Sequence, residues 1–114
     1  MGRASRVKGQ VAEREVAKII SETLGIPMLR RTPLSGGMDW KGDVVGWDGY
    51  HVEVKRQERL SIPAWIKQAE DDCPPGSVPL VIYRQSHQPW RVVITLNDLL
   101  TIITNKEKQH DEVS

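Results

Sequence analysis

The sequence of 114 residues contains only one cysteine, Cys73. A single cysteine excludes an internal disulfide and a zinc site built from several cysteines, and it fits the reducing conditions of the cytoplasm. The chain also lacks any apolar run that approaches the length of a membrane span, and its first residues lack the pattern of a signal peptide. We therefore expect a cytoplasmic protein of one domain without a membrane segment.

The chain lacks a strong charge of either sign, because 16 Lys and Arg residues face 15 Asp and Glu residues, for a net charge of +1. A basic field over the whole molecule is therefore absent. Acidic residues gather at 70–72 and in the C-terminal tail. Basic residues gather near the start of the chain and before its centre, at Arg3, Arg6, Lys8, Arg30, Arg31 and Lys41. This asymmetry indicates a basic side that can follow a phosphate backbone, although scattered basic residues are more often ordinary surface.

Hydrophobic periodicity predicts three helices, at about residues 8–24, after a cap at Ser61, and at about 96–103 after a cap at Thr95. Apolar runs predict strands at residues 28–31, 42–45, 51–55, 80–83 and 91–94. The last two runs are nearly continuous, which is typical of strands covered on both faces. This order predicts an α/β domain in which a central mixed five-stranded sheet is flanked by helices.

Both ends of the chain are polar. We expect residues 1–7 to form a flexible basic arm and residues 105–114 to form a disordered polar tail. A single domain would then span residues 8–104.

The chain is organised around the expected strand at 51–55. Because side chains alternate along a strand, His51, Glu53 and Lys55 share one face. A carboxylate and an ammonium two residues apart can both reach one phosphate and its metal ion. The ordinary interpretation is a solvated face with a weak ion pair, in which His51 is a surface residue of the strand.

The turn before this strand decides whether Asp43 joins the same face. A two-residue loop of Asp48 and Gly49 would place Asp43 on the face opposite to Glu53. A three-residue loop that also contains Trp47, with Gly49 left-handed, would place Asp43 directly across from Glu53. The sequence permits both registers. Only the second, or a bulge with the same effect, brings the two carboxylates together, and oxygen ligands of this kind suit Mg²⁺ or Mn²⁺ rather than zinc.

Two polar residues on the expected helices are further candidates. Glu13 lies on the apolar side of the first helix, where burial without a partner would be costly. It either meets a cation, a metal or a water-filled cleft, or it lies near the helix start, where the dipole stabilises it. Gln68 flanks the apolar stripe of the second helix beside Trp65. It could hydrogen-bond Lys55 or a phosphate, although such a glutamine is more often simply solvated.

Taken in chain order, these residues resemble a known family. The matching pieces are Lys8-Gly9, residues 13–15, Arg30-Arg31, residues 35–37, Gly42-Asp43, residues 53–55 and Gln68. The chain resembles the PD-(D/E)XK nucleases, the restriction-endonuclease-like superfamily, and more narrowly the archaeal-type Holliday junction resolvases and their phage relatives. Gly42 stands where the superfamily name has a proline, at a position that varies within the superfamily.

The resemblance implies an αβββαβ restriction-endonuclease-like core and Mg²⁺-dependent hydrolysis of phosphodiester bonds in branched DNA, with Mn²⁺ as a substitute. It also implies a homodimer that acts on four-way junctions, in the host cytoplasm if a phage encodes it. The implied metal ligands are Glu13, Asp43, Glu53 and the carbonyl of Val54. The implied catalytic residues are Asp43, Glu53, Lys55, which would activate the attacking water, and Gln68, which would support it. The residues expected to contact DNA are Arg3, Arg6, Lys8, Arg30, Arg31, Ser35, Lys41 and Arg56.

Three other interpretations stay open. A nuclease of the same superfamily could cut flaps, ends or duplex DNA, since a fold does not determine a substrate. A DNA-binding module could keep the fold without cutting, although such a module would have little reason to retain Asp43, Glu53 and Lys55 together. A small structural α/β protein could use the hairpin only for an ion pair, and it would place Asp43 and Glu53 on opposite faces.

Overall fold

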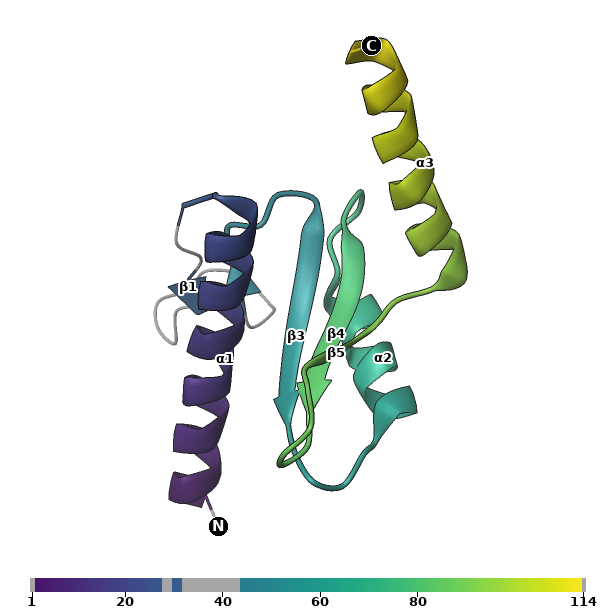
Figure 1. The fold of residues 1–114 in the computed structure, drawn as a ribbon. Coiled ribbons are helices and arrows are strands. Elements are labelled where there is room, and N and C mark those ends of the chain that lie inside the picture. The colour runs from purple at the N-terminus through teal and green to yellow at the C-terminus, as the bar shows by residue number, and fades with distance from the viewer. Residues whose placement is uncertain (1, 28–29, 32–43, 114) are drawn as a thin grey trace.

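The computed structural model describes residues 2–27, 30–31 and 44–113. The elements follow in the order α1 (Gly2–Leu24), β1 (Arg30–Arg31), β2 (Val44–Val45), β3 (Tyr50–Arg56), α2 (Ile62–Asp72), β4 (Val78–Arg84), β5 (Arg91–Val93) and α3 (Leu96–Val113) (Figure 1). The predicted α/β class, with a mixed sheet flanked by helices, is confirmed. β3 and β4 are the long strands, with seven residues each, whereas β1 and β2 have two each.

The strands lie in the order β1-β2-β3-β4-β5 within one sheet. β3 and β4 run parallel, and the other neighbours pair antiparallel. The segment that contains α2 makes the crossover between β3 and β4, as a parallel pair requires. The two longest strands therefore lie side by side in the middle of the sheet.

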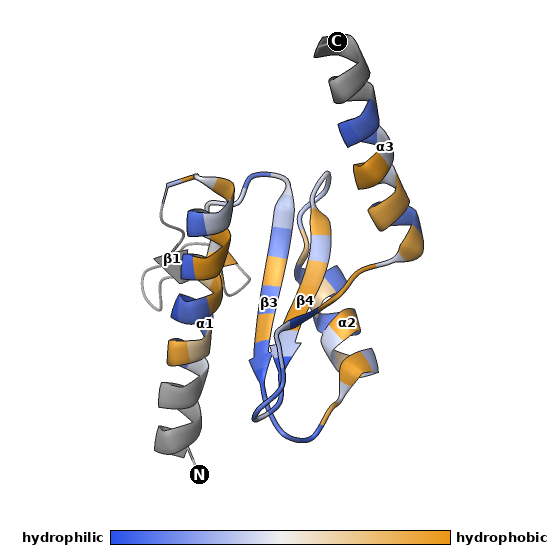
Figure 2. Cartoon of the chain, viewed as in Figure 1, coloured by the Kyte–Doolittle hydropathy of each residue, from blue (hydrophilic) through white to orange (hydrophobic). Residues whose placement is uncertain are grey.

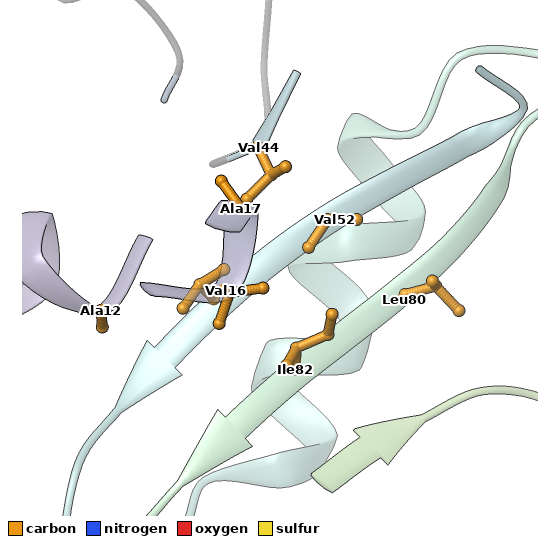
Figure 3. Close-up of a cluster of buried hydrophobic side chains, with 8 residues drawn as sticks. Ala12, Val16, Ala17, Val44, Val52, Leu80 and Ile82 are labelled. Atoms are coloured by element: carbon orange, nitrogen blue, oxygen red, sulfur yellow. The ribbon is translucent and has the colours of Figure 1, made fainter. Parts of the chain in front are cut away.

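The two faces of β3 and β4 are covered by different helices. Val52 and Val54 of β3 belong to a buried cluster with Val16 of α1, which Figure 3 shows against the strands. On the other face, Val81 of β4 packs with Trp65 of α2 in a second cluster. The alternation of orange and blue along β3 in Figure 2 reflects its sequence, in which apolar and polar residues alternate. Because its apolar residues belong to the α1 face, its polar residues lie on the α2 face.

A polar contact also connects α1 to the loop between β4 and β5. The indole Nε1 of Trp90 donates a hydrogen bond to Oε1 of Glu15 at 3.0 Å. The guanidinium carbon of Arg84 lies 5.2 Å from the centroid of the Trp90 ring, a cation–π geometry. These contacts attach α1 to a segment far away in the sequence.

Both ends of the chain differ from the prediction. α1 begins at Gly2, so residues 2–7 form its first turns rather than a flexible arm. α3 continues to Val113, so the described part of the expected tail is helical rather than disordered. The physical reason is similar at both ends: residues 2–7 include the good helix formers Ala and Arg, residues 105–113 include Lys and Glu, and neither stretch contains proline.

The helix caps are only partly as predicted. The hydroxyl of Thr95 accepts a hydrogen bond from the Asp98 N–H at 3.1 Å, as expected of a cap. Ser61 occupies the N-cap position of α2, but its side chain makes no capping hydrogen bond. α2 therefore begins at its predicted position without the predicted contact.

The two C-terminal strands differ in their burial. Leu80, Val81 and Ile82 of β4 are buried, which confirms coverage on both faces. Val92 of β5 is 55% exposed, so the same prediction was wrong for β5. β5 is the last strand in the order of the described sheet, and Val93 alone packs toward α2. An apolar run by itself does not distinguish such an edge strand from a central one.

Candidate active site

The hairpin between β2 and β3 has the register expected of the three-residue loop, although its turn has only two central residues, Asp48 and Gly49. Val44 pairs with Val52, and the Tyr50 N–H donates to the Trp47 carbonyl at 3.1 Å. Gly49 has a φ of +87° within this turn, and Gly46 has a φ of +98° just before it, which fits a bulge that shifts the pairing by one residue. The observed pairing is that of the second register considered above. Asp43 itself lies outside the described residues.

The side chains of the central motif follow the alternation of β3. Glu53 is only 2% exposed, and Lys55 is half-buried. In the parallel ladder, Glu53 pairs with Val81 and Lys55 with Tyr83. These β4 residues pack toward α2, so the polar residues of β3 lie on the face that α2 partly covers. β3 therefore carries an apolar face toward α1 and a polar face toward α2.

A hydrogen bond joins α2 to Lys55. The Nζ of Lys55 donates to Oε1 of Gln68 at 2.9 Å. Gln68 takes this position because Trp65 and Ala69, its neighbours on α2, are buried in the cluster against β4. The packing of the helix thus directs the adjacent amide toward the strand. The sequence suggested Lys55 or a phosphate as the partner of Gln68, and in the structure that partner is Lys55.

His51 does not lie on the surface, as the sequence had suggested. It is 5% exposed, and its Nε2 lies 3.2 Å from Oε1 of Glu53. His51 also lines a cavity of about 350 Å³ at the start of β3, together with Trp47 and Tyr50. The rings of Trp47 and Tyr50 stack with centroids 4.3 Å apart. The alternation along β3 had placed His51 beside Glu53, but the burial of the pair depends on elements distant in the sequence.

Glu13 projects from the middle of α1. It is half-buried and its Oε2 is buried, while its neighbours Ala12, Val16 and Ala17 belong to the core. The helix dipole acts most strongly within the first turn of a helix. Since α1 begins at Gly2, Glu13 lies well past that turn. Stabilisation by the dipole, one of the two suggested roles, is therefore excluded.

Arg56 is held by a polar cluster at the end of β3. Its Nη1 contacts Oε2 of Glu58 at 2.8 Å, and its Nη2 donates to the Ser86 hydroxyl at 3.0 Å. The Ser86 backbone N–H also donates to Glu58, and together with Arg56 it lowers the pKa of Glu58 to about 2. This cluster connects the end of β3 with the turn after β4. The contact of Arg56 with DNA stays a prediction.

The side chains of several predicted site residues lie outside the described part of the structure. Asp43, Ser35 and Lys41 lie outside the described residues. For the other predicted DNA contacts only the backbone is described, with Arg3, Arg6 and Lys8 in α1 and Arg30 and Arg31 in β1. β1 pairs with β2 beside the hairpin, which places Arg31 opposite Val44.

The metal prediction can be compared with the donors that are described. Among residues 2–27, 30–31 and 44–113, no group of three or more His, Cys, Asp or Glu side chains is arranged to hold a metal ion. The buried carboxylate of Glu53 and the adjacent carbonyl of Val54 are oxygen donors, the type that Mg²⁺ prefers. The donor type fits the implied cation.

No helix in the described part of the chain is both long enough and apolar enough to cross a membrane.

Comparison with known families decides the family of the chain. A family model described as "Phage putative PDDEXK endonuclease" matches residues 4–113. The chain belongs to this family. The predicted membership of the PD-(D/E)XK superfamily, with its phage association, is thereby confirmed. Searches of curated proteins and of solved structures find no match. In this PDDEXK chain, Glu53-Val54-Lys55 has the spacing of the E-x-K part of the motif in the family name, and its assignment to that motif stays a prediction.

Proposed function

We propose that this PDDEXK protein is a Mg²⁺-dependent, structure-selective DNA endonuclease, and specifically a Holliday junction resolvase. The observation that carries the proposal is the arrangement of Glu53, Lys55 and Gln68. The carboxylate and the ammonium lie on one face of β3, and α2 holds the ammonium through a hydrogen bond of 2.9 Å. An ordinary surface strand would need neither a buried carboxylate nor a lysine held by a second element.

The hairpin register supports the inclusion of Asp43 in this site. Val44 pairs with Val52. If the antiparallel pairing extends by one residue, Asp43 comes opposite Glu53, and directly opposed residues share a face. We therefore propose Asp43 and Glu53 as the paired carboxylates of the site, with the Val54 carbonyl and Glu13 as further oxygen donors.

These oxygen donors would hold one or two Mg²⁺ ions, and Mn²⁺ would substitute. A bound cation supplies charge neutralisation at the scissile phosphate and a nucleophilic water. Lys55 would act beside it. Its ammonium has three N–H donors, one of which contacts Gln68, so the group can still reach a phosphate oxygen or the attacking water. Gln68 would keep that ammonium in place as negative charge develops on the phosphate.

The specificity for branched DNA is the finer part of the proposal. A resolvase cuts two opposed strands of a four-way junction, and a homodimer with two identical sites at fixed separation suits that task. The basic residues of α1 and β1 would follow the phosphate backbone. Sedimentation of the protein alone and with a junction would measure the oligomeric state.

A cleavage assay tests the proposal. A labelled four-way junction and the matching linear duplex are incubated with the protein in Mg²⁺ and in EDTA. The variants are Glu53→Gln and Asp43→Asn, with Glu22→Gln, an exposed glutamate of α1, as the matched control. We expect paired symmetric nicks in the junction only, in Mg²⁺ only, from the wild type and the control. The two site variants should still bind DNA, because removal of a carboxylate reduces the repulsion of phosphate.

Each alternative has its own result. Equal cutting of the junction and the duplex would retain the nuclease and contradict the junction specificity, in favour of a nuclease for flaps, ends or duplex DNA. Tight DNA binding without cutting in any divalent cation would contradict the enzyme and favour a DNA-binding module. Loss of DNA binding by folded Glu53→Gln would contradict the assignment of Glu53 as a metal ligand.

A further inference from the structure

The contact between His51 and Glu53 is more specific than their spacing requires. Residues two apart on a strand have their Cα atoms about 7 Å apart, so neighbouring side chains on one face need not touch. Here Nε2 of His51 comes within 3.2 Å of Oε1 of Glu53. Both residues are buried, with 5% and 2% exposed. The histidine therefore constrains the orientation of the carboxylate.

The chemistry of the pair decides the direction of the hydrogen bond. A Glu53 that binds a metal is an ionised carboxylate and only accepts hydrogen bonds, so Nε2 of His51 then carries the hydrogen and donates it. The donor also offsets part of the cost of burying the charge of Glu53. A carboxylate has about four lone-pair positions on its two oxygens. The hydrogen bond at Oε1 thus uses one of these positions and restrains the orientation of the group.

We propose that His51 is a positioning residue, which donates from Nε2 to the Glu53 carboxylate and holds it in the orientation that binds a divalent cation. This inference rests on the proposed function, because it takes Glu53 as a metal ligand. It assigns to His51 a role that neither the motif of the family nor the strand pattern gives it. Groups that orient a metal ligand commonly change metal affinity by about 10–100-fold when they are removed.

Two amide substitutions separate positioning from packing. In His51→Gln the side-chain nitrogen can occupy the place of Nε2 and still donate to Glu53. In His51→Asn the amide is shorter and reaches only the place of Nδ1. Both replacements are polar and neutral, so they differ mainly in reach. The matched control is His87→Asn, since His87 is exposed in the turn after β4 and has a φ of +61°, which asparagine tolerates.

The measurement is the affinity of the metal-free protein for Mn²⁺ by isothermal titration calorimetry, with the unfolding temperature recorded for each variant. We expect His51→Asn to weaken Mn²⁺ binding about tenfold or more. His51→Gln should stay within about threefold of the wild type, and His87→Asn should bind like the wild type. Nicking of DNA by the two His51 variants should follow the same order when Mn²⁺ is not saturating.

Three results would overturn the inference. Wild-type affinity in His51→Asn, with or without a lower unfolding temperature, would mean that His51 only stabilises the fold. An equal loss in His51→Gln and His51→Asn would mean that the imidazole itself is needed, as for a direct metal ligand. The Gln variant tests the inference even if the Asn variant does not fold. A large loss of Mn²⁺ affinity in folded His51→Gln would contradict the positioning role of His51. Absence of Mn²⁺ binding by the wild type would instead overturn the proposed metal site together with this inference.

Discussion

Replacement of Gln68 with alanine removes the contact that holds Lys55. The hydrogen bond from Lys55 Nζ to Gln68 Oε1 is 2.9 Å long, and it joins a charged donor to a neutral acceptor. Hydrogen bonds to charged groups contribute about 1.5–3 kcal/mol, and the exposure of Gln68 favours the lower end of that range. If the bond positions the ammonium in the transition state, its loss should reduce kcat about tenfold, since 1.36 kcal/mol corresponds to a factor of ten.

The assay is the rate of junction nicking at saturating Mg²⁺, with kcat and KM determined separately. The matched control is Glu70→Ala, an exposed position on the same helix, which should keep kcat within about twofold of the wild type. Glu70→Ala should unfold within about 0.5 kcal/mol of the wild type, because it replaces an exposed side chain, and Gln68→Ala should lose no more than about 1.5 kcal/mol, the contribution of its hydrogen bond. A wild-type kcat in Gln68→Ala would refute the positioning of Lys55 by α2. A rise in KM with unchanged kcat would show that Gln68 acts in substrate binding instead.

Three further predictions concern the fold and the DNA interface. Val52 is 0% exposed in the core, so Val52→Ala should lower the free energy of unfolding in urea by about 2 kcal/mol, from lost burial and the cavity that remains. The Ser86 N–H and its neighbours lower the pKa of Glu58 from 4.5 to about 2, so this carboxylate stabilises the folded state above pH 4.5 and loses that effect as the pH falls toward 2. The stability difference between the wild type and Glu58→Gln, from urea unfolding at each pH, should shrink over that window. Replacement of Arg30 and Arg31 by alanine should weaken binding to every DNA and flatten its salt dependence.

Each of these three predictions has a matched control. Val92→Ala, at a position 55% exposed, should leave stability within about 0.5 kcal/mol, and an equal loss at both valines would contradict the core assignment. Glu107→Gln, at an exposed position of α3, removes the same charge away from this cluster, and a stability difference for Glu58→Gln that stays constant with pH would contradict the lowered pKa of Glu58. Replacement of Arg14 and Lys18, exposed on α1, provides a charge-matched control for the arginines of β1. An unchanged salt slope after loss of Arg30 and Arg31 would remove β1 from the DNA interface.

The central part of the chain could be predicted because local patterns determine it. The stripe of Trp65 and Ala69 directed one face of α2 to the sheet, and it left Gln68 next to that face. The pairing of Val44 with Val52 is one of the two registers that the sequence permitted, and the turn glycines Gly46 and Gly49 with positive φ allow it. In these cases the physical cause, periodicity or turn geometry, acts over a few residues and is visible in the sequence.

The burial of His51 could not be predicted from the same patterns. Alternation along β3 shows that His51 and Glu53 share a face, but it does not show whether that face is exposed. Burial depends on the parallel pairing with β4, in which His51 lies beside Pro79, and on the return of the chain after α2. Both are contacts between segments distant in the sequence. The exposure of Val92 was mispredicted for the same reason, because the position of β5 in the sheet is a property of the whole fold.

The register of β3 connects the stability of this fold to its proposed chemistry. A slip of one residue would turn Val52 toward α2 and the Glu53 carboxylate into the apolar cluster under α1. That exchange would bury a charge among apolar side chains and remove Val52 from its cluster, so the core strongly disfavours it. The α1 cluster therefore keeps Glu53 and Lys55 on the face where Gln68 of α2 can contact the lysine. Core substitutions that loosen this register should impair the site more than their cost in stability alone would suggest.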